Sequence, residues 1–192
     1  MRLTPGAFLR VGLLLVLAVV LQLSTLSQMP ILGGHFDIVV LVVAAVAYYA
    51  GSLSGSAVGF AAGFLLDLLS GATMGASSLV LTAVGYGVGR FRELRDPSHG
   101  LLPIAVGGVA TAAWVTAFAA VSFMLDVGAS VSVLVVRDMA VTILLGAAVS
   151  FPVFAVVRRL LRPVLVVDPF EVRRKRQAPR EAGPLGLRGL EV

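Results

Sequence analysis

The sequence contains no cysteine and only two histidines, His35 and His99. Without cysteine the chain can form neither a disulfide framework nor a thiolate metal site, and two histidines so far apart do not predict a histidine-based metal cluster. Motifs that carry chemistry are missing as well. There is no phosphate-binding loop, no His-Glu-x-x-His sequence, no nucleophile with a nearby base, and no pair of carboxylates at helical spacing. We therefore expect a protein that is not an enzyme and that holds no catalytic residue, metal or cofactor.

Charged residues are also scarce. They make up 13% of the 192 residues, and hydrophobic residues make up 58%. A soluble domain carries roughly 25% charged and about 45–50% apolar residues. The mean hydropathy is +1.00, and the apolar residues are spread over most of the chain. No aqueous core could hide so much apolar surface, so lipid must be the solvent for most of it, and the fold class is an all-α membrane protein.

Six apolar segments approach the length of about 20 residues that a membrane-spanning helix requires. They lie at about 8–26, 36–50, 53–69, 74–88, 101–125 and 131–161. Apart from the charged loop Arg90–Gly100, the connections are very short, so consecutive helices should be antiparallel neighbours. We predict a compact bundle of six transmembrane helices in residues 1–162. A basic cytoplasmic tail, largely disordered because it is poor in apolar residues, follows in residues 163–192.

The basic residues predict the orientation of this bundle. Lys and Arg remain on the cytoplasmic side of a membrane far more often than the reverse. With the N-terminus inside and six spans, every basic residue except Arg137 falls on the cytoplasmic side. We therefore expect a multi-pass membrane protein with both termini cytoplasmic, and no binding to nucleic acid. Segment 8–26 could instead be a signal peptide, but Ser24–Gln28 offers no cleavage site.

Basic residues cluster where the last span ends. They are Arg158, Arg159, Arg162, Arg173, Arg174, Lys175 and Arg176. The simpler interpretation is a stop-transfer flank that leads into a disordered end. The alternative is contact with anionic lipid, worth about 1 kcal/mol per cation near the surface, or with a cytoplasmic partner.

Glycines recur at every fourth position through and around the third apolar segment, with one aspartate in the series. The positions are Gly51, Gly55, Gly59, Gly63, Asp67, Gly71 and Gly75. Gly85 and Gly89 repeat the spacing in the next segment. A four-residue step returns close to the same helix face, so Gly55, Gly59 and Gly63 predict a smooth groove that another helix can approach closely. That helix could belong to the same bundle or to a single-span partner. Gly71 and Gly75 lie beyond the helix end and should shape the next turn.

Three ionisable residues lie within the expected spans on the outer side. Asp67 stands near the end of segment 53–69, and Arg137 with Asp138 stands in the outer part of segment 131–161. Because ionisable groups at membrane depth usually face the bundle interior and pair, we predict an ion pair between Asp67 and Arg137. Asp138 and Asp126 are competing partners for Arg137. The alternative is that each group meets interfacial water.

The run Gly59-Phe60-Ala61-Ala62-Gly63-Phe64-Leu65-Leu66-Asp67-Leu68-Leu69-Ser70-Gly71, followed by Gly75 and by Gly85-Tyr86, resembles the MreD family of bacterial rod-shape-determining membrane proteins. The polar end of the first helix (Gln22-Leu23-Ser24) and Asp37 are also similar. The likeness covers residues 1–162 in layout and is specific over about 59–89. The tail from Pro163 is not part of the family pattern.

This resemblance implies a non-enzymatic component of the cell-elongation machinery. The implied partners are MreC, which has a single membrane span, possibly RodA and a class B penicillin-binding protein, MreB indirectly, and membrane lipids. The implied role is to help organise lateral peptidoglycan synthesis and rod shape. The family's fold is similar to the substrate-binding subunits of energy-coupling-factor transporters, so the alternative function is a substrate-binding membrane subunit of a vitamin-type transporter.

Overall fold

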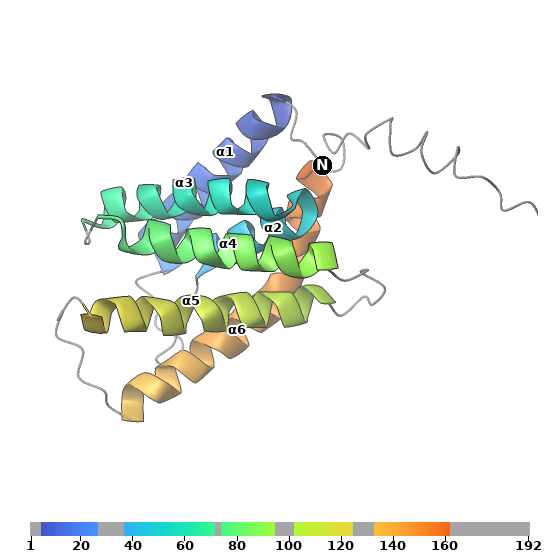
Figure 1. Cartoon of the computed structure of the whole chain (residues 1–192). Helices are drawn as coiled ribbons and strands as arrows, with labels where there is room; N and C mark the ends of the chain where they lie inside the picture. Colours follow the sequence, from blue (N-terminus) through green and yellow to red (C-terminus); the bar gives the residue numbers. More distant parts are fainter. Residues whose placement is uncertain (1–4, 27–36, 72–73, 95–101, 125–132, 162–192) are drawn as a thin grey trace, which may run out of the picture.

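The computed structural model describes residues 5–26, 37–71, 74–94, 102–124 and 133–161. These residues form six α-helices, and α1 continues into one π-helical turn, η1. The elements are α1 (Pro5–Leu21), η1 (Gln22–Leu26), α2 (Ile38–Ala50), α3 (Ser52–Ser70), α4 (Ala76–Leu94), α5 (Leu102–Met124) and α6 (Val133–Leu161). The described part of the chain contains no strand, so the all-helical prediction is confirmed there (Figure 1).

Each of the six expected segments overlaps one of these helices, and α1, α3 and α4 extend beyond the expected bounds. Within the described residues, three stretches are long and apolar enough to cross a membrane, namely Ser52–Ser70, Pro103–Val121 and Val135–Leu161. Two further apolar helices, Leu9–Ser24 and Ile38–Ala50, are shorter. Crossing by all six helices therefore stays a prediction.

Helix α4 differs from the sequence prediction, which began a charged loop at Arg90. The helix continues to Leu94. Its last turn is held by neighbouring helices, because Arg92 donates a hydrogen bond to the backbone carbonyl of Tyr49 and Glu93 accepts hydrogen bonds from Ser52. These contacts are made with distant parts of the sequence, so local patterning could not reveal them.

Helix α2 forms the core of the bundle. Every residue from Val39 to Tyr48 is buried, and α1, α3, α4, α5 and α6 all contact this helix. A helix that is apolar on all sides belongs inside a bundle or a membrane. At 13 residues it is roughly 20 Å long, whereas the hydrocarbon core of a bilayer is about 30 Å thick. The polar groups at both of its ends therefore need partners within the protein.

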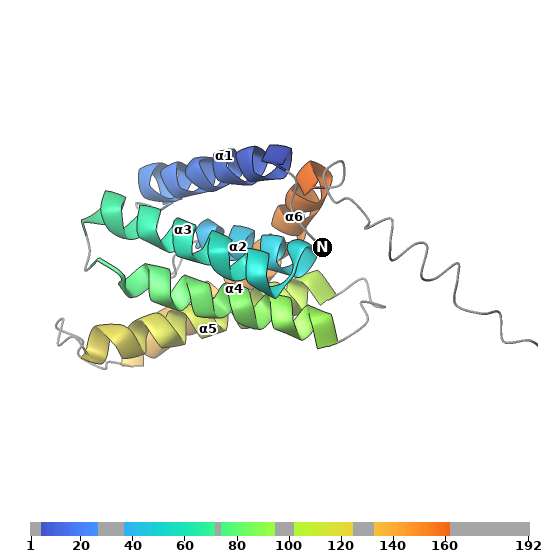
Figure 2. The same cartoon turned by 45° about the horizontal axis from the view of Figure 1, so that its top comes forward.

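The charged side chains of the described helices separate toward two ends. The start of α1 and the ends of α2, α4 and α6 lie at one end of the molecule in both views (Figure 1, Figure 2). These segments carry Arg10, Arg90, Arg92, Arg158 and Arg159, so we call this the basic end. The start of α2, the end of α3 and the start of α6 lie at the opposite end, with Asp37, Asp67, Arg137 and Asp138.

Candidate functional site

The glycine series lies where α3 and α4 pack against each other. A Cβ atom added to Gly55 would stand 2.6 Å from the carbonyl oxygen of Gly85. A Cβ on Gly59 would overlap the backbone of Leu81, and one on Gly63 would overlap the backbone of Ser78. The two backbones are thus in direct contact, as small residues allow between helices in lipid.

The partner of this glycine groove is therefore a helix of the same chain. Gly85 and Gly89 return the contact from α4, since a Cβ at either position would overlap the backbone of Gly55 or of Ser52. From the sequence, the helix against the groove could belong to the same bundle or to a partner, and in the structure it belongs to the same bundle. It leaves no room on that face for a helix from another protein.

Gly71 and Gly75 lie in the connection between α3 and α4. Their φ angles are +64° and +100°, in a region that residues with a side chain rarely adopt. Gly71 ends α3 in the left-handed conformation that commonly terminates helices. A Cβ at either position would meet nothing within 4 Å, so these two glycines are required by backbone conformation and not by packing.

Asp67 is buried at the end of α3, with only 1% of its surface exposed. Its carboxylate accepts hydrogen bonds from the backbone N–H groups of Gly75, Ser77 and Ser78, at 2.8, 3.2 and 3.4 Å. These amides belong to the N-terminus of α4, where N–H groups lack partners within the helix and the helix dipole favours negative charge. Asp67 therefore caps α4 from the neighbouring helix.

The predicted ion pair between Asp67 and Arg137 is wrong for the described residues. Arg137 is exposed at the start of α6, and no ion pair joins it to the buried Asp67 among the described residues. The physical reason is that three backbone amides already compensate the buried carboxylate, so no cation is needed there.

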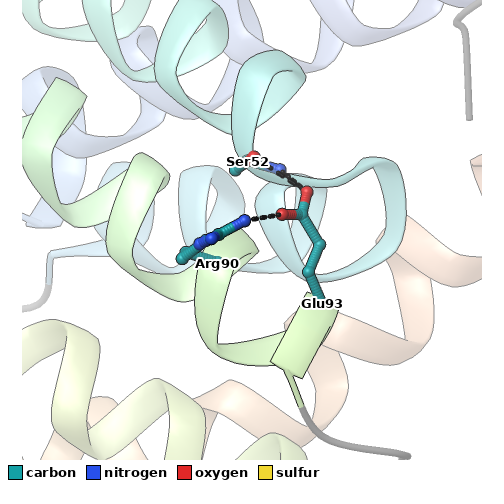
Figure 3. Close-up of polar contacts among 3 residues, drawn as sticks. All are labelled: Ser52, Arg90 and Glu93. Atoms are coloured by element: carbon teal, nitrogen blue, oxygen red, sulfur yellow. Dashed lines mark hydrogen bonds and ion pairs between the residues drawn. The ribbon is translucent and has the colours of Figure 1, made fainter.

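Glu93, near the end of α4, makes the corresponding contact at the basic end. One carboxylate oxygen accepts hydrogen bonds from the backbone N–H and the hydroxyl of Ser52, the first residue of α3, at 2.9 and 2.8 Å (Figure 3). The other oxygen pairs with Arg90 at 3.4 Å. The backbone hydrogen bond from Ser52, then its hydroxyl and Arg90, hold the pKa of Glu93 below its usual value. Each helix of the pair is thus capped at its N-terminus by a carboxylate of the other.

The backbone groups at both ends of α2 also bond to side chains of other helical segments. At its N-terminus the backbone N–H of Val39 donates to the Gln22 side-chain oxygen at 2.9 Å, and the Gln22 amide nitrogen donates to Asp37 at 3.1 Å. At its C-terminus Arg92 donates to the carbonyl of Tyr49 at 2.9 Å and lies over the ring of Tyr48. A cation at a helix C-terminus matches the helix dipole.

A groove of about 460 Å³ separates α1 from α6. Its walls are leucines and valines of α1 and α6, with Ile38 and Val42 of α2 as floor, and its single charged residue is Arg10. A second hollow of about 380 Å³ lies on the other side of α6 at the basic end. It contains Arg158 and Arg159, and Val156 lines both spaces.

Sequence reasoning missed three residues of these contacts. The sequence places Gln22 in the polar end of the first helix, and Arg92 and Glu93 in a charged loop. The residue types alone offered a hint. An acidic or amide side chain stabilises a helix N-terminus that it faces, and a cationic side chain stabilises a helix C-terminus. Arg162, Arg173, Arg174, Lys175 and Arg176 lie outside the described residues.

The polar contacts described above hold helices in place. Within the described ranges no three His, Cys, Asp or Glu side chains come together as a metal site would require. Asp67, Glu93 and Gln22 are all engaged with the start of a helix. Asp67, the most deeply buried charged side chain of the described residues, thus stabilises a helix end, whereas the buried hydroxyls of Thr111 and Ser150 bond to carbonyls of their own helices.

Comparison with known proteins gives one match. A family model described as rod shape-determining protein MreD matches residues 4–164. No match was found among curated proteins or among solved structures. The matched region contains every helix described above. The chain therefore belongs to the MreD family of membrane proteins, whose role is the determination of rod shape.

Proposed function

We propose that this chain is a non-enzymatic component of the bacterial cell-elongation machinery that binds MreC and helps to organise lateral peptidoglycan synthesis. RodA and a class B penicillin-binding protein are further partners in this proposal, and MreB is an indirect one. The observation that carries it is the family match over residues 4–164. The use of the buried Asp67 carboxylate as a helix cap supports a structural role.

The proposal includes a multi-pass arrangement in the inner membrane with both termini in the cytoplasm. The gathering of Arg10, Arg90, Arg92, Arg158 and Arg159 at one end supports it, because cytoplasmic flanks of membrane helices are rich in Arg and Lys. The transporter alternative needs polar and aromatic side chains that converge on a substrate. The hollow between α1 and α6 is lined by aliphatic side chains and one arginine. The aromatic side chains Tyr49, Phe151 and Phe154 line the hollow at the basic end, which faces the cytoplasm in this proposal and not an external substrate.

The partner is tested by affinity purification of the full-length chain from native membranes in mild detergent. We expect MreC to be enriched over a purification of an unrelated multi-pass protein that carries the same tag. Recovery of an ATPase with its transmembrane coupling protein, in place of MreC, would establish the transporter alternative. Absence of MreC from a monodisperse preparation would overturn the proposal.

The orientation is tested with single cysteines, since the natural chain has none. Met124 and Leu94 are both exposed, at the ends of α5 and α4 that point in opposite directions. A membrane-impermeant maleimide added to intact spheroplasts should label Met124→Cys and should label Leu94→Cys only after lysis. The reverse pattern would show that the basic end faces outward.

A further inference from the structure

The groove between α1 and α6 has an apolar lining and an arginine at one end, and this combination suits an anionic lipid. Its walls carry leucine and valine side chains, which match the hydrocarbon of lipid, and Arg10 closes it at the basic end. Val156 lines both the groove and the adjoining hollow, and Arg159 lies three residues further along α6. Arg159 lines the adjoining hollow and not the groove itself. It lies one helical turn from Val156, the residue that lines both spaces. Arg10 and Arg159 are both exposed.

The length of the groove matches one leaflet of a bilayer. Its lining on α1 runs from Arg10 to Leu21, which corresponds to roughly 17 Å of helix. The hydrocarbon core of a bilayer is about 30 Å thick, so one leaflet contributes about 15 Å. An acyl chain that begins at Arg10 would thus run along the groove as far as Leu21 and the start of α2, a length that suits the chain of one leaflet.

The shape and charge of this site differ from what a partner helix requires. An α-helix with its side chains is about 10–12 Å across, and close helix association in lipid relies on small residues. Leu13, Leu14 and Leu17 line the groove on the α1 side, so they would keep a second backbone at a distance. A flexible chain can follow such a surface, and a phosphate can reach the cations at its end.

We propose that this groove binds an anionic phospholipid from the leaflet at the basic end, with an acyl chain between α1 and α6 and its phosphate at Arg10 and Arg159. The lipid fills the space that α1 leaves against the rest of the bundle. The site is independent of the partner proposed above, since it requires only the chain and the membrane.

The test is native mass spectrometry of the full-length protein in detergent, titrated with phosphatidylglycerol or with phosphatidylcholine of the same chain length. We expect the first phosphatidylglycerol to bind more tightly than the first phosphatidylcholine. Arg10→Gln with Arg159→Gln should weaken phosphatidylglycerol binding roughly 25-fold, because each cation near an anionic headgroup contributes about fivefold. Arg90→Gln with Arg137→Gln removes the same charge at positions outside the groove and should leave the affinity unchanged.

A second pair of variants tests the acyl-chain space. Val156→Trp fills the groove, and Val136→Trp is its control, because both valines are exposed on α6 (54% and 59%) and only Val156 lines the groove. Only Val156→Trp should weaken lipid binding. Equal affinity of the wild type for the two lipids, or unchanged binding in the arginine double variant, overturns the proposal. If Val156→Trp releases a co-purified single-span protein and leaves lipid binding intact, the groove is a seat for a partner's helix and the lipid proposal is wrong.

Discussion

The α3–α4 contact and the space between α1 and α6 are both formed by apolar helices. In the first the two helix backbones touch, and in the second a groove remains between the helices. In α3 the facing positions are Gly55, Gly59 and Gly63, and the backbone of α4 touches them at Gly85, Leu81 and Ser78 respectively. Between α1 and α6 the facing positions are leucine and valine, and about 460 Å³ remains between them. Side-chain size at the contact thus separates a closed pair from an open groove.

This difference matters because burial from water does not drive helices together inside a bilayer. Lipid tails are as apolar as leucine, so association depends on close van der Waals packing and on polar contacts. The α3–α4 pair has both, since glycines bring the backbones together and a carboxylate caps each helix. The α1–α6 side has neither along its groove. We infer that the pair is the rigid part of the bundle and that α1 is more weakly held.

The largest expected effect comes from adding one methyl group to the closed contact. Gly59→Ala places a Cβ against the carbonyl of Leu81, which belongs to the backbone and cannot move aside. Overpacking of a well-packed contact typically costs about 1–3 kcal/mol, and a backbone clash belongs at the upper limit. We expect a large loss of monodisperse protein and a lower Tm in detergent, measured by size-exclusion chromatography and thermal unfolding.

The same substitution on the open side is the matched control. A Cβ at Gly12 of α1 meets nothing within 4 Å, so Gly12→Ala should leave the yield and the Tm unchanged or slightly higher, since alanine favours helix more than glycine. Equal behaviour of the two variants would remove the contrast between the two sides of the bundle.

The next effect concerns the buried cap. Asp67→Ala leaves the amides of Gly75, Ser77 and Ser78 without their acceptor, and an unsatisfied buried group costs about 1–3 kcal/mol. Asp67→Asn retains one acceptor oxygen, so its Tm should lie between those of Asp67→Ala and the wild type. Asp138→Asn, on a half-buried aspartate of α6, is the control and should have little effect.

A charge reversal separates this capping role from the ion pair expected from sequence. Arg137→Asp combined with Asp67→Arg restores opposite charges but puts a cation at the N-terminus of α4, where the dipole disfavours it. We expect the double variant to be no more stable than Asp67→Arg alone. Recovery of the Tm in the double variant would mean that the two side chains do interact.

The glycine spacing points to one face of the helix, because a four-residue step keeps residues on one side whatever lies against them, and α4 lies against that face. The sequence could not identify the neighbour as α4, since the same face suits a helix of another chain. Asp67 shows a second limit. Its partners are backbone amides, which every residue has, and their position depends on the turn through Gly71 and Gly75. A search for charged partners in the sequence could not find them.

The groove shows a third limit of reasoning from sequence. The leucines and valines of α1 and α6 predicted two membrane helices, and that pattern is the same whether the helices touch or stand apart. Their separation follows from how both helices pack on α2, and α2 is enclosed on all sides. The groove is therefore a property of the assembled bundle.

The smallest effect comes from the exposed cap at the basic end. The hydrogen bonds from Ser52 lower the pKa of Glu93 below its usual value of 4.5, so folding favours the carboxylate form. A carboxylate with a lowered pKa stabilises the folded state at pH above its unfolded value and loses that contribution as the pH falls through its folded value. The Tm of the wild type should therefore exceed that of Glu93→Gln slightly at neutral pH, and this difference should shrink as the pH falls below 4.5. Other acids titrate in both proteins and cancel in the comparison. A difference that stays constant with pH would show that the Glu93 charge contributes nothing, and that Asp67 alone supplies the electrostatic part of the closed α3–α4 contact.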